Sequence, residues 1–365
     1  RVLSATVRDM MSTQEKNGRI STYEQEHDFS NWDIWSRKYV MLGMEYFLEI
    51  CEEPELAKEI TECLCRQCDY LCDRLGDREE NKLPVTETTR IYGGMNSASV
   101  LEPVVWLYRL TGNGRYLKLA EHIVSTGGSR AADIFRLALE DRVDPYEYGV
   151  SKAYEMMSCF EGLCEYYRAT GDARDLETVR LFWDKVREEE ITLLGSGGAD
   201  APFNLGPGTG EQWNRTRLEQ TNPAIDLMME TCVTVYWMRL CHQLLRLTGE
   251  VRYADAMEVS LYNAIFGALR PDGAFFEYFP RFNGARNPRV NYSFNIKGFD
   301  LSCCTANGPT GLALAPDIAF AGTPDGIAVN LYMTGCARVP VPGGQVVLSM
   351  QSEFPRVGYA RLTIE

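Results

Sequence analysis

The sequence lacks the features that direct a protein to nucleic acid or to a membrane. It has no run of basic residues, and 37 lysines and arginines stand against 51 acidic residues, for a net charge of −14. This balance argues against binding to nucleic acid or to an anionic membrane surface. No apolar run approaches the ~18 residues of a spanning helix, so we expect no membrane partner.

A signal peptide is also not recognisable, although the chain opens on Arg1 and its true N-terminus is not visible. Cysteine, in contrast, is abundant, with 12 residues in 365. A chain of this size can form a core without disulfides, which favours reduced thiols and a cytoplasmic location. Four cysteines crowd into TECLCRQCDYLC, at positions 63, 65, 68 and 72. A stripe of small residues on one helix face is the favoured interpretation, and a metal cluster is the alternative.

Most of the chain has the 3.6-residue periodicity of helices. One pattern recurs in YRLTGNGRYLKLA, YRATGDARDLETV and LRLTGEVRYADAM, where a helix ends at Thr-Gly and another begins. Gly112, Gly171 and Gly249 suit the left-handed conformation that ends helices. Repeated helix hairpins predict a mainly α fold, an (α/α)6-type toroid in which paired helices surround a central cavity, over residues 1–320.

The last segment of the chain has a different pattern. GIAVNLYMTG and GQVVLSMQSEF alternate, are rich in β-branched residues and are separated by Pro and Gly. These properties predict strands over residues 321–365, as the start of a separate β domain.

Two predicted loop-to-helix junctions carry thiols. Glu230 and Cys232 precede or open a helix expected to start near Val233, and Cys303 and Cys304 precede a short helix expected to begin near Gly308-Pro309. Three thiols and a carboxylate suit a tetrahedral zinc site. The two pairs are about 70 residues apart, so buried thiols and a capping glutamate are the more common explanation on spacing alone.

Longer segments around these residues resemble glycoside hydrolase family 127, the family of the β-L-arabinofuranosidases. They are ETC at 230–232, RYADAMEVSLYNAIFGALRPDGAFFEYF at 252–279 and SCCTANG at 302–308, with weaker likeness in QEKNGRISTY and LEPVVWLYRLTGNGRYLKLAEHIV. The resemblance implies Zn2+ as cofactor, with Glu230, Cys232, Cys303 and Cys304 as ligands. It also implies an N- and C-terminally shortened member whose β segment begins a β-sandwich domain.

The resemblance further implies catalytic roles. Cys303 falls on the family's nucleophile, and Glu211 in GEQW falls on its acid/base glutamate, with Glu219 in LEQTN as the rival. Two more site residues of the family match Glu258 and Tyr278, for which a helix-surface carboxylate and a half-buried ring are equally open interpretations. A coordinated thiol is deprotonated, and the mechanism implied is a retaining one through a cysteine thiolate.

The sequence departs from the family in its sugar-binding shell. Three histidine positions of the arabinofuranosidases align with Tyr39, Ala98 and Lys152, and we take Tyr39 and Lys152 as candidate substrate-binding residues. None of the three histidines, His27, His122 and His242, matches these positions. His122 and His242 are expected to be ordinary helix residues. The zinc chemistry is thus predicted to be kept while the identity of the sugar is open.

The predicted function is a retaining glycoside hydrolase that cleaves an L-arabinofuranoside or related plant-glycan sugar, with an oligosaccharide or glycoside as its partner. A homodimer is compatible with this function. The alternative is a non-catalytic, zinc-stabilised carbohydrate-binding α/α toroid, which does not need Glu211 to face Cys303. A sugar epimerase is disfavoured because such enzymes use paired histidines, and a zinc prenyl-group enzyme because no Asp-rich diphosphate motif is present.

Overall fold

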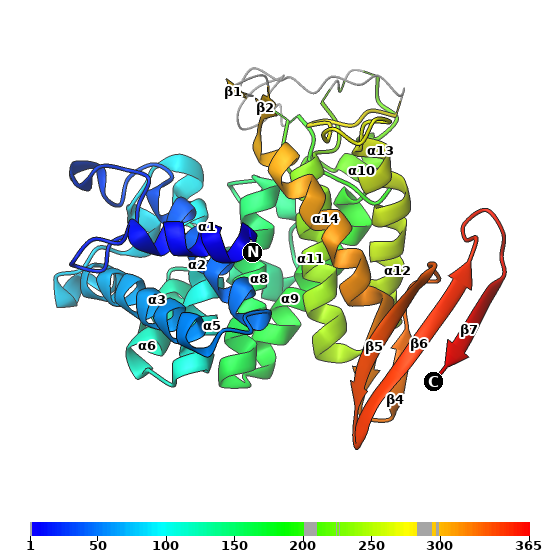
Figure 1. Cartoon of the computed structure of the whole chain (residues 1–365). Coiled ribbons are helices and arrows are strands. Elements are labelled where there is room, and N and C mark those ends of the chain that lie inside the picture. The colour runs from blue at the N-terminus through cyan, green and yellow to red at the C-terminus, as the bar shows by residue number, and fades with distance from the viewer. Residues whose placement is uncertain (1, 201–209, 224, 226, 283–293, 297–298) are drawn as a thin grey trace. The chain divides into compact units, whose positions relative to one another are not determined.

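The computed structural model describes residues 2–200, 210–223, 225, 227–282, 294–296 and 299–365. The chain divides into two compact units, Arg1–Glu189 and Glu190–Glu365 (Figure 1). No helix in the described part of the chain is both long and apolar enough to cross a membrane.

The first unit is helical. Its α-helices are α1 (Val2–Ser12), α2 (Asp33–Glu49), α3 (Pro54–Arg74), α4 (Met95–Ala98), α5 (Leu101–Thr111), α6 (Gly114–Ser125), α7 (Ile134–Glu140), α8 (Ala153–Thr170) and α9 (Ala173–Lys185). Single 3₁₀ turns connect them at η1 (Gln25–His27), η2 (Arg78–Glu80), η3 (Val85–Glu87), η4 (Ile91–Gly94) and η5 (Pro145–Glu147), and a π turn follows at η6 (Val186–Glu190). Helix α5 packs against both α6 and α8, and α8 packs against α9.

The predicted Thr-Gly helix turns are confirmed. Gly112, Gly171 and Gly249 have φ of 70°, 74° and 71°, and each donates its N–H to the carbonyl four residues earlier, at 2.7–2.8 Å. After the first two, the side chains of Asn113 and Asp172 accept the N–H two residues on and cap the next helix. The recurring motif therefore encodes a helix end and a helix start, each cap contributing about 1 kcal/mol.

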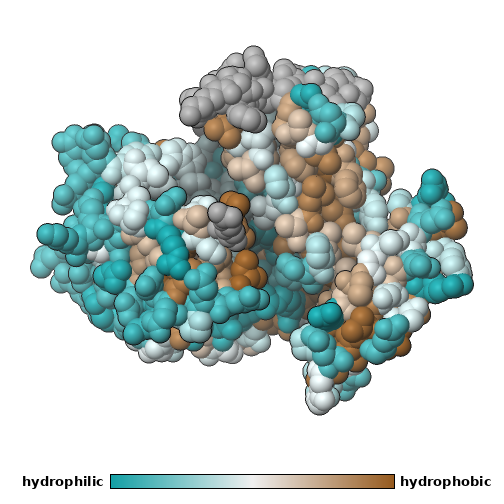
Figure 2. Space-filling view, viewed as in Figure 1, coloured by the Kyte–Doolittle hydropathy of each residue, from teal (hydrophilic) through white to brown (hydrophobic). Residues whose placement is uncertain are grey.

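The second unit combines helices with short sheets. Its helices are α10 (Thr216–Glu219), α11 (Thr231–Thr248), α12 (Val251–Ser260), the π turn η7 (Leu261–Ile265), α13 (Phe266–Ala268) and α14 (Cys303–Ala319). Helix α11 packs against both α12 and α14. Figure 2 shows apolar residues along α14, which has two prolines and many small or apolar side chains.

Strands follow α14, as the sequence predicted. They are β3 (Phe320–Thr323), β4 (Gly326–Val329), β5 (Gly335–Val341), β6 (Gly344–Ser352) and β7 (Ala360–Ile364), and a hairpin of β1 (Phe294–Ile296) and β2 (Phe299–Leu301) precedes the helix. All pairs are antiparallel, in the sheets β1-β2, β3-β4 and β5-β6-β7. The domain boundary at residue 320 stays a prediction, since the compact units divide at residue 189.

One expectation about α14 is wrong. The sequence suggested that a helix begins near Gly308-Pro309, but it begins at Cys303 and Pro309 lies inside it. The reason is a cap further upstream, because the Ser302 hydroxyl accepts the Thr305 N–H at 3.2 Å and the Thr305 hydroxyl accepts the Ser302 N–H at 2.9 Å. The cysteine pair is therefore in the first helical turn and not in the preceding loop.

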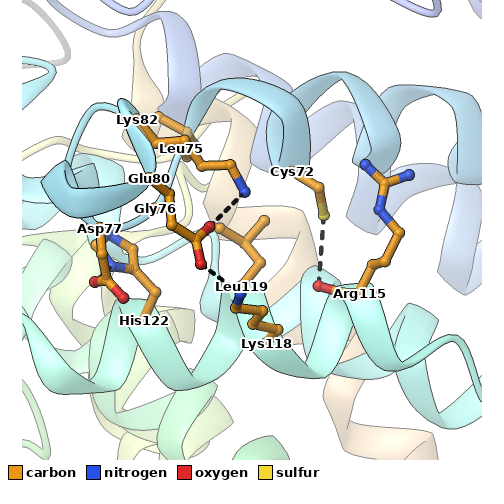
Figure 3. Close-up of a pocket in the computed structure, with 10 residues that line it drawn as sticks. All are labelled: Cys72, Leu75, Gly76, Asp77, Glu80, Lys82, Arg115, Lys118, Leu119 and His122. Atoms are coloured by element: carbon orange, nitrogen blue, oxygen red, sulfur yellow. Dashed lines mark hydrogen bonds and ion pairs between the residues drawn. The ribbon is translucent and has the colours of Figure 1, made fainter.

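A cavity of about 210 Å³ lies in the first unit beside the cysteine-rich helix α3 (Figure 3). Cys72 lines it, and its thiol lies 3.6 Å from the carbonyl oxygen of Arg115. His122 also lines it, with Nδ1 2.7 Å from an Asp77 carboxylate oxygen and Nε2 accepting the Val85 N–H at 3.3 Å. His122 thus has a structural role on α6.

Candidate metal centre and active site

The start of α11 is held by two distant segments of the second unit. Glu230 stands just before the helix and donates its N–H to the Gly197 carbonyl at 2.7 Å. Thr231 donates its N–H to the Tyr278 carbonyl at 3.1 Å and its hydroxyl to the Glu277 carbonyl at 2.6 Å. The carboxylate of Glu230 and the thiol of Cys232, the second residue of the helix, are therefore fixed by backbone contacts on both sides.

Glycines bring α14 close to its neighbours. A Cβ built at Gly308 would lie 2.1 Å from the Phe276 ring, and one at Gly311 would lie 2.7 Å from Ile265 and 3.1 Å from Val235 of α11. A methyl group at either position would force these neighbours to shift, most of all the Phe276 ring. The GPTG segment thus allows the helix bearing Cys303 and Cys304 to approach the helix bearing Cys232.

The two helix starts bring the four predicted metal ligands together. The thiols of Cys232, Cys303 and Cys304 and a carboxylate oxygen of Glu230 all lie within 4.8 Å of one another. The sulfur atoms of Cys232 and Cys304 are 3.3 Å apart, and Cys304 Sγ is 3.8 Å from Glu230 Oε1. Sulfur ligands of a tetrahedral zinc ion stand about 3.8 Å apart, so the set has the dimensions of such a site.

The chemistry of this donor set also fits a divalent cation. Three of its members are buried and Cys303 is exposed. Burial, followed by the neighbouring thiols, raises the pKa of the Cys232 thiol well above its usual range, and burial does the same for Cys304. Deprotonating these groups together requires a compensating positive charge, and a thiolate-rich tetrahedral set is one that zinc prefers.

A tyrosine connects the predicted acid/base to the predicted nucleophile. The Tyr278 hydroxyl donates a hydrogen bond to Glu211 Oε1 and lies 3.1 Å from Cys303 Sγ. Burial, followed by the nearby carboxylates of Glu230 and Glu211, raises the pKa of Tyr278, so the hydroxyl stays protonated and can donate. The geometry thus brings Glu211, Tyr278 and Cys303 to one place.

Glu211 holds an unusual backbone conformation. Its φ is 67°, in the left-handed region that a residue with a side chain rarely adopts. A conformation of this kind costs about 1–3 kcal/mol and persists where the surroundings impose it, commonly at functional sites. The rival Glu219 lies on α10, where its carboxylate accepts from the Asn222 amide at 2.7 Å. Within the described residues it makes no hydrogen bond with Tyr278 or Cys303.

The remaining predicted substrate-binding residues are on α12 of the second unit and in the first unit. Glu258 is half-buried on α12, and its pKa is raised by burial and by the neighbouring Asp255 carboxylate. Within the described residues its side chain makes no hydrogen bond with the candidate ligands. The other two belong to the first unit, where the hydroxyl of Tyr39 bonds that of Tyr154 and Lys152 Nζ is 3.4 Å from Glu155. Substrate binding by all three stays a prediction.

The sequence assigned no role to one residue at the metal centre. Asn307, one helical turn after Cys303, donates its side-chain amide N–H to Cys232 Sγ at 3.2 Å. Residues that hydrogen-bond a ligand atom orient it and tune its affinity for the metal. The sequence could have revealed Asn307 by its spacing from Cys303 and Cys304, because residues three and four positions apart share a helix face.

The chain is similar to known glycosidases over nearly its whole length. A family model described as β-L-arabinofuranosidase, GH127 catalytic domain, matches residues 2–317. A curated relative, the non-reducing end β-L-arabinofuranosidase of Bifidobacterium longum subsp. longum, is 21% identical over 375 aligned residues, which cover 95% of this chain and 52% of that protein.

Solved structures give the same result. The GH127 β-L-arabinofuranosidase of Geobacillus stearothermophilus T6 has a TM-score of 0.73 at 18% identity and covers 99% of this chain. A second GH127 β-arabinofuranosidase has a TM-score of 0.71 at 20% identity and also covers 99%. This likeness confirms the predicted fold class, a mainly α toroid followed by the start of a β domain. The chain spans 58% and 55% of these two proteins. Because the family model matches residues 2–317, the chain belongs to the family of the GH127 catalytic domain, a family of glycoside hydrolases.

Proposed function

We propose that this chain carries the active site of a retaining glycoside hydrolase, with Cys303 as nucleophile and Glu211 as acid/base. One observation supports this most directly: the Tyr278 hydroxyl bonds Glu211 and lies 3.1 Å from the exposed thiol of Cys303. The expected substrate is an L-arabinofuranoside or a related plant-glycan sugar, from the names of the relatives. The activity and substrate belong to this proposal because the chain spans only about half of those relatives.

The metal centre would prepare the nucleophile. Zn2+ held by Glu230, Cys232, Cys303 and Cys304 would keep the thiols deprotonated at neutral pH, where a free thiol with a pKa of about 8.5 is mostly protonated. Cys303 is the exposed member of the set. It is therefore the thiol that a substrate can reach.

The first chemical step forms a covalent intermediate. Cys303 Sγ attacks the anomeric carbon, a C–S bond forms, and the bond from that carbon to the leaving oxygen breaks. Glu211 gives its proton to that oxygen. Tyr278 donates to Glu211 and holds the carboxyl group in place beside the sulfur.

The second step releases the sugar. The Glu211 carboxylate takes a proton from water, the water oxygen attacks the anomeric carbon, and the C–S bond breaks to return the Cys303 thiolate. Two inversions at the same carbon give overall retention of configuration, as in retaining glycosidases with two carboxylates.

The alternative is a non-catalytic carbohydrate-binding protein stabilised by zinc. Structural zinc sites are closed by four protein ligands, and such a site would need neither an exposed thiol nor Glu211. The exposure of Cys303 beside three buried ligands, and the tyrosine bridge to Glu211, favour the enzyme.

The deciding experiment combines covalent trapping with a leaving-group series. A slow or electrophilic glycoside should add the mass of one sugar residue to the peptide containing Cys303. Glu211→Gln should slow substrates with poor leaving groups most, because only these need full protonation. Glu219→Gln is the matched control and should change the rate neither for poor nor for activated leaving groups. An adduct elsewhere, or full activity of Cys303→Ser, would show that the thiolate mechanism is wrong.

A further inference from the structure

The two residues next to Glu211 are hydrogen-bonded to a distant segment of the chain, residues 199–200. Ala199 and Gln212 exchange backbone hydrogen bonds in both directions, at 2.8 and 3.0 Å. The Asp200 carboxylate accepts the N–H of Gly210 at 2.7 Å, and its backbone N–H donates to the Leu227 carbonyl at 2.9 Å. The residues immediately before and after Glu211 are therefore both tied to segment 199–200.

A second carboxylate holds the C-terminal side. Glu190 is fully buried and accepts three consecutive backbone N–H groups, from Asn214, Arg215 and Thr216, at 3.1, 3.0 and 3.0 Å. Arg215 is itself in the left-handed region, with φ of 54°. The three N–H groups are shared between the two oxygens of one carboxylate. No neutral side chain offers as many acceptor lone pairs.

The two carboxylates are linked to each other through the segment. The side-chain amide of Asn214 donates to the backbone carbonyl of Asp200. Gln212 and Trp213, which lie in the sequence between Glu211 and Asn214, are buried, with exposed fractions of 2% and 1%. The segment therefore cannot shift without disturbing packed side chains. Burial raises the pKa of Glu190 to about 7, against the effect of the three N–H donors.

We propose that Glu190 and Asp200 are positioning residues that clamp segment 210–216 at both ends and so aim Glu211 at Tyr278 and Cys303. The clamp explains how Glu211 is kept at a φ that its side chain disfavours. The proposal rests on the proposed function, since it assumes that Glu211 is the acid/base. In this arrangement neither Glu190 nor Asp200 contacts the sugar.

The test uses Glu190→Gln, which keeps the size of the side chain but replaces one of the two accepting oxygens by an NH2 group, so that at least one of the three N–H groups loses its acceptor. Turnover of substrates with poor leaving groups should fall by about 10- to 100-fold, the effect of a small misplacement of a catalytic group. Activated leaving groups should lose little, and zinc content should not change. Asp200→Ala should give the same graded pattern and serves as the second variant if Glu190→Gln does not fold.

Hydrogen exchange provides a readout that does not depend on activity. The amides of residues 210–216 should exchange faster in both variants, while those of α11 should not. The matched control is Asp33→Asn in the first unit, a buried carboxylate that accepts the Phe29 N–H at 2.9 Å and should leave the leaving-group dependence unchanged.

Two outcomes would overturn the proposal: unchanged exchange at 210–216, or equal loss for all leaving groups. If the wild-type chain cleaves no glycoside, the proposed function fails, and the exchange measurement alone decides whether the clamp exists.

Discussion

Two groups of cysteines in this chain differ in what their spacing means. Four of them crowd within ten residues of α3, at positions 63, 65, 68 and 72, and three of these are buried in the first unit. The other group comes from positions 232, 303 and 304, yet its sulfur atoms gather with Glu230 within 4.8 Å. Within the described residues, the α3 cysteines form no comparable set of metal-ligating side chains.

The difference follows from helix geometry. Side chains three and four positions apart on one helix point in the same direction. Their sulfur atoms therefore line a stripe in which neighbours such as Cys68 and Cys72 interact in pairs, without the convergence of three or more ligands on one point. In the second unit, α11 and α14 pack against each other, and side chains at the starts of the two helices meet at one point. Convergence of two backbone segments, and not density in the sequence, produces a ligand set.

The largest expected effect compares one cysteine from each group. Cys303→Ser should reduce turnover by roughly 10⁴-fold or more, because a serine hydroxyl is not ionised enough to replace a thiolate. Cys68→Ser, the matched control on α3, should keep the wild-type rate once folded. Steady-state kinetics on an aryl glycoside measures both. Equal losses in the two variants would mean that Cys303 acts only through stability.

Metal content should separate the groups next. We expect about one zinc per chain, and Cys304→Ser should lose most of it because a buried ligand is removed. Cys72→Ser on α3 should keep all of it. Elemental analysis of the purified, dialysed variants gives the answer. Retention of zinc in a Cys232→Ser, Cys304→Ser double variant would move the metal site away from these residues.

Local signals in the sequence predicted the helical architecture well. The Thr-Gly turns were predictable because a glycine cap and the following Asn or Asp cap act over a few residues. The start of α14 differs from the prediction because Pro309 is a typical first-turn residue, whereas the helix is capped upstream by Ser302, which directly follows β2. The competing local signal was present in the sequence but weaker.

The site was predictable only in part. Family resemblance pointed to Glu230, the cysteines and Glu211, and the structure brings their side chains together. Glu190 could not be found in this way, because its partners are backbone N–H groups 24 to 26 residues later and a backbone donor leaves no trace in the sequence. The left-handed φ of Glu211 likewise has no local signal, and its neighbours Gly210 and Gln212 are hydrogen-bonded to the distant segment 199–200.

A smaller effect tests how the sulfur atoms of the two groups are hydrogen-bonded. Cys72 donates its thiol hydrogen to a carbonyl, which requires a protonated sulfur, whereas Cys232 accepts an N–H from Asn307, which suits a thiolate. Asn307→Ala should weaken zinc binding by about tenfold or more, measured by competition with a chelator. Asn263→Ala, an exposed helical amide bonded to the Val259 carbonyl, is the control. Equal zinc affinities of the wild-type chain and Asn307→Ala would mean that Asn307 contributes only packing.

The smallest expected effect compares two buried acids. Glu190 in the second unit has three N–H donors. In the part of the chain that the structure describes, neither carboxyl oxygen of Glu45 on α2 of the first unit has a hydrogen-bond partner. Burial, followed by the Glu102 and Glu165 carboxylates, raises the pKa of Glu45 well above its usual value near 4.5. The folded chain therefore keeps a proton that the unfolded chain releases.

The effect of Glu45 on the free energy of unfolding changes with pH in a defined direction. As pH rises above about 4.5, the unfolded state binds fewer protons at this position than the folded state, so Glu45 lowers stability progressively until the pH reaches its folded-state pKa. Glu45→Leu removes both this penalty and an unsatisfied polar group, and should stabilise the chain by about 1–3 kcal/mol at pH 8. The gain should be smaller at pH 5, where the unfolded state also retains part of its protons. Urea unfolding at the two pH values measures the effect, with the exposed Glu49→Gln on the same helix as control. A loss of stability at both pH values would mean that Glu45 has a compensating partner, and the contrast with Glu190 would then be wrong.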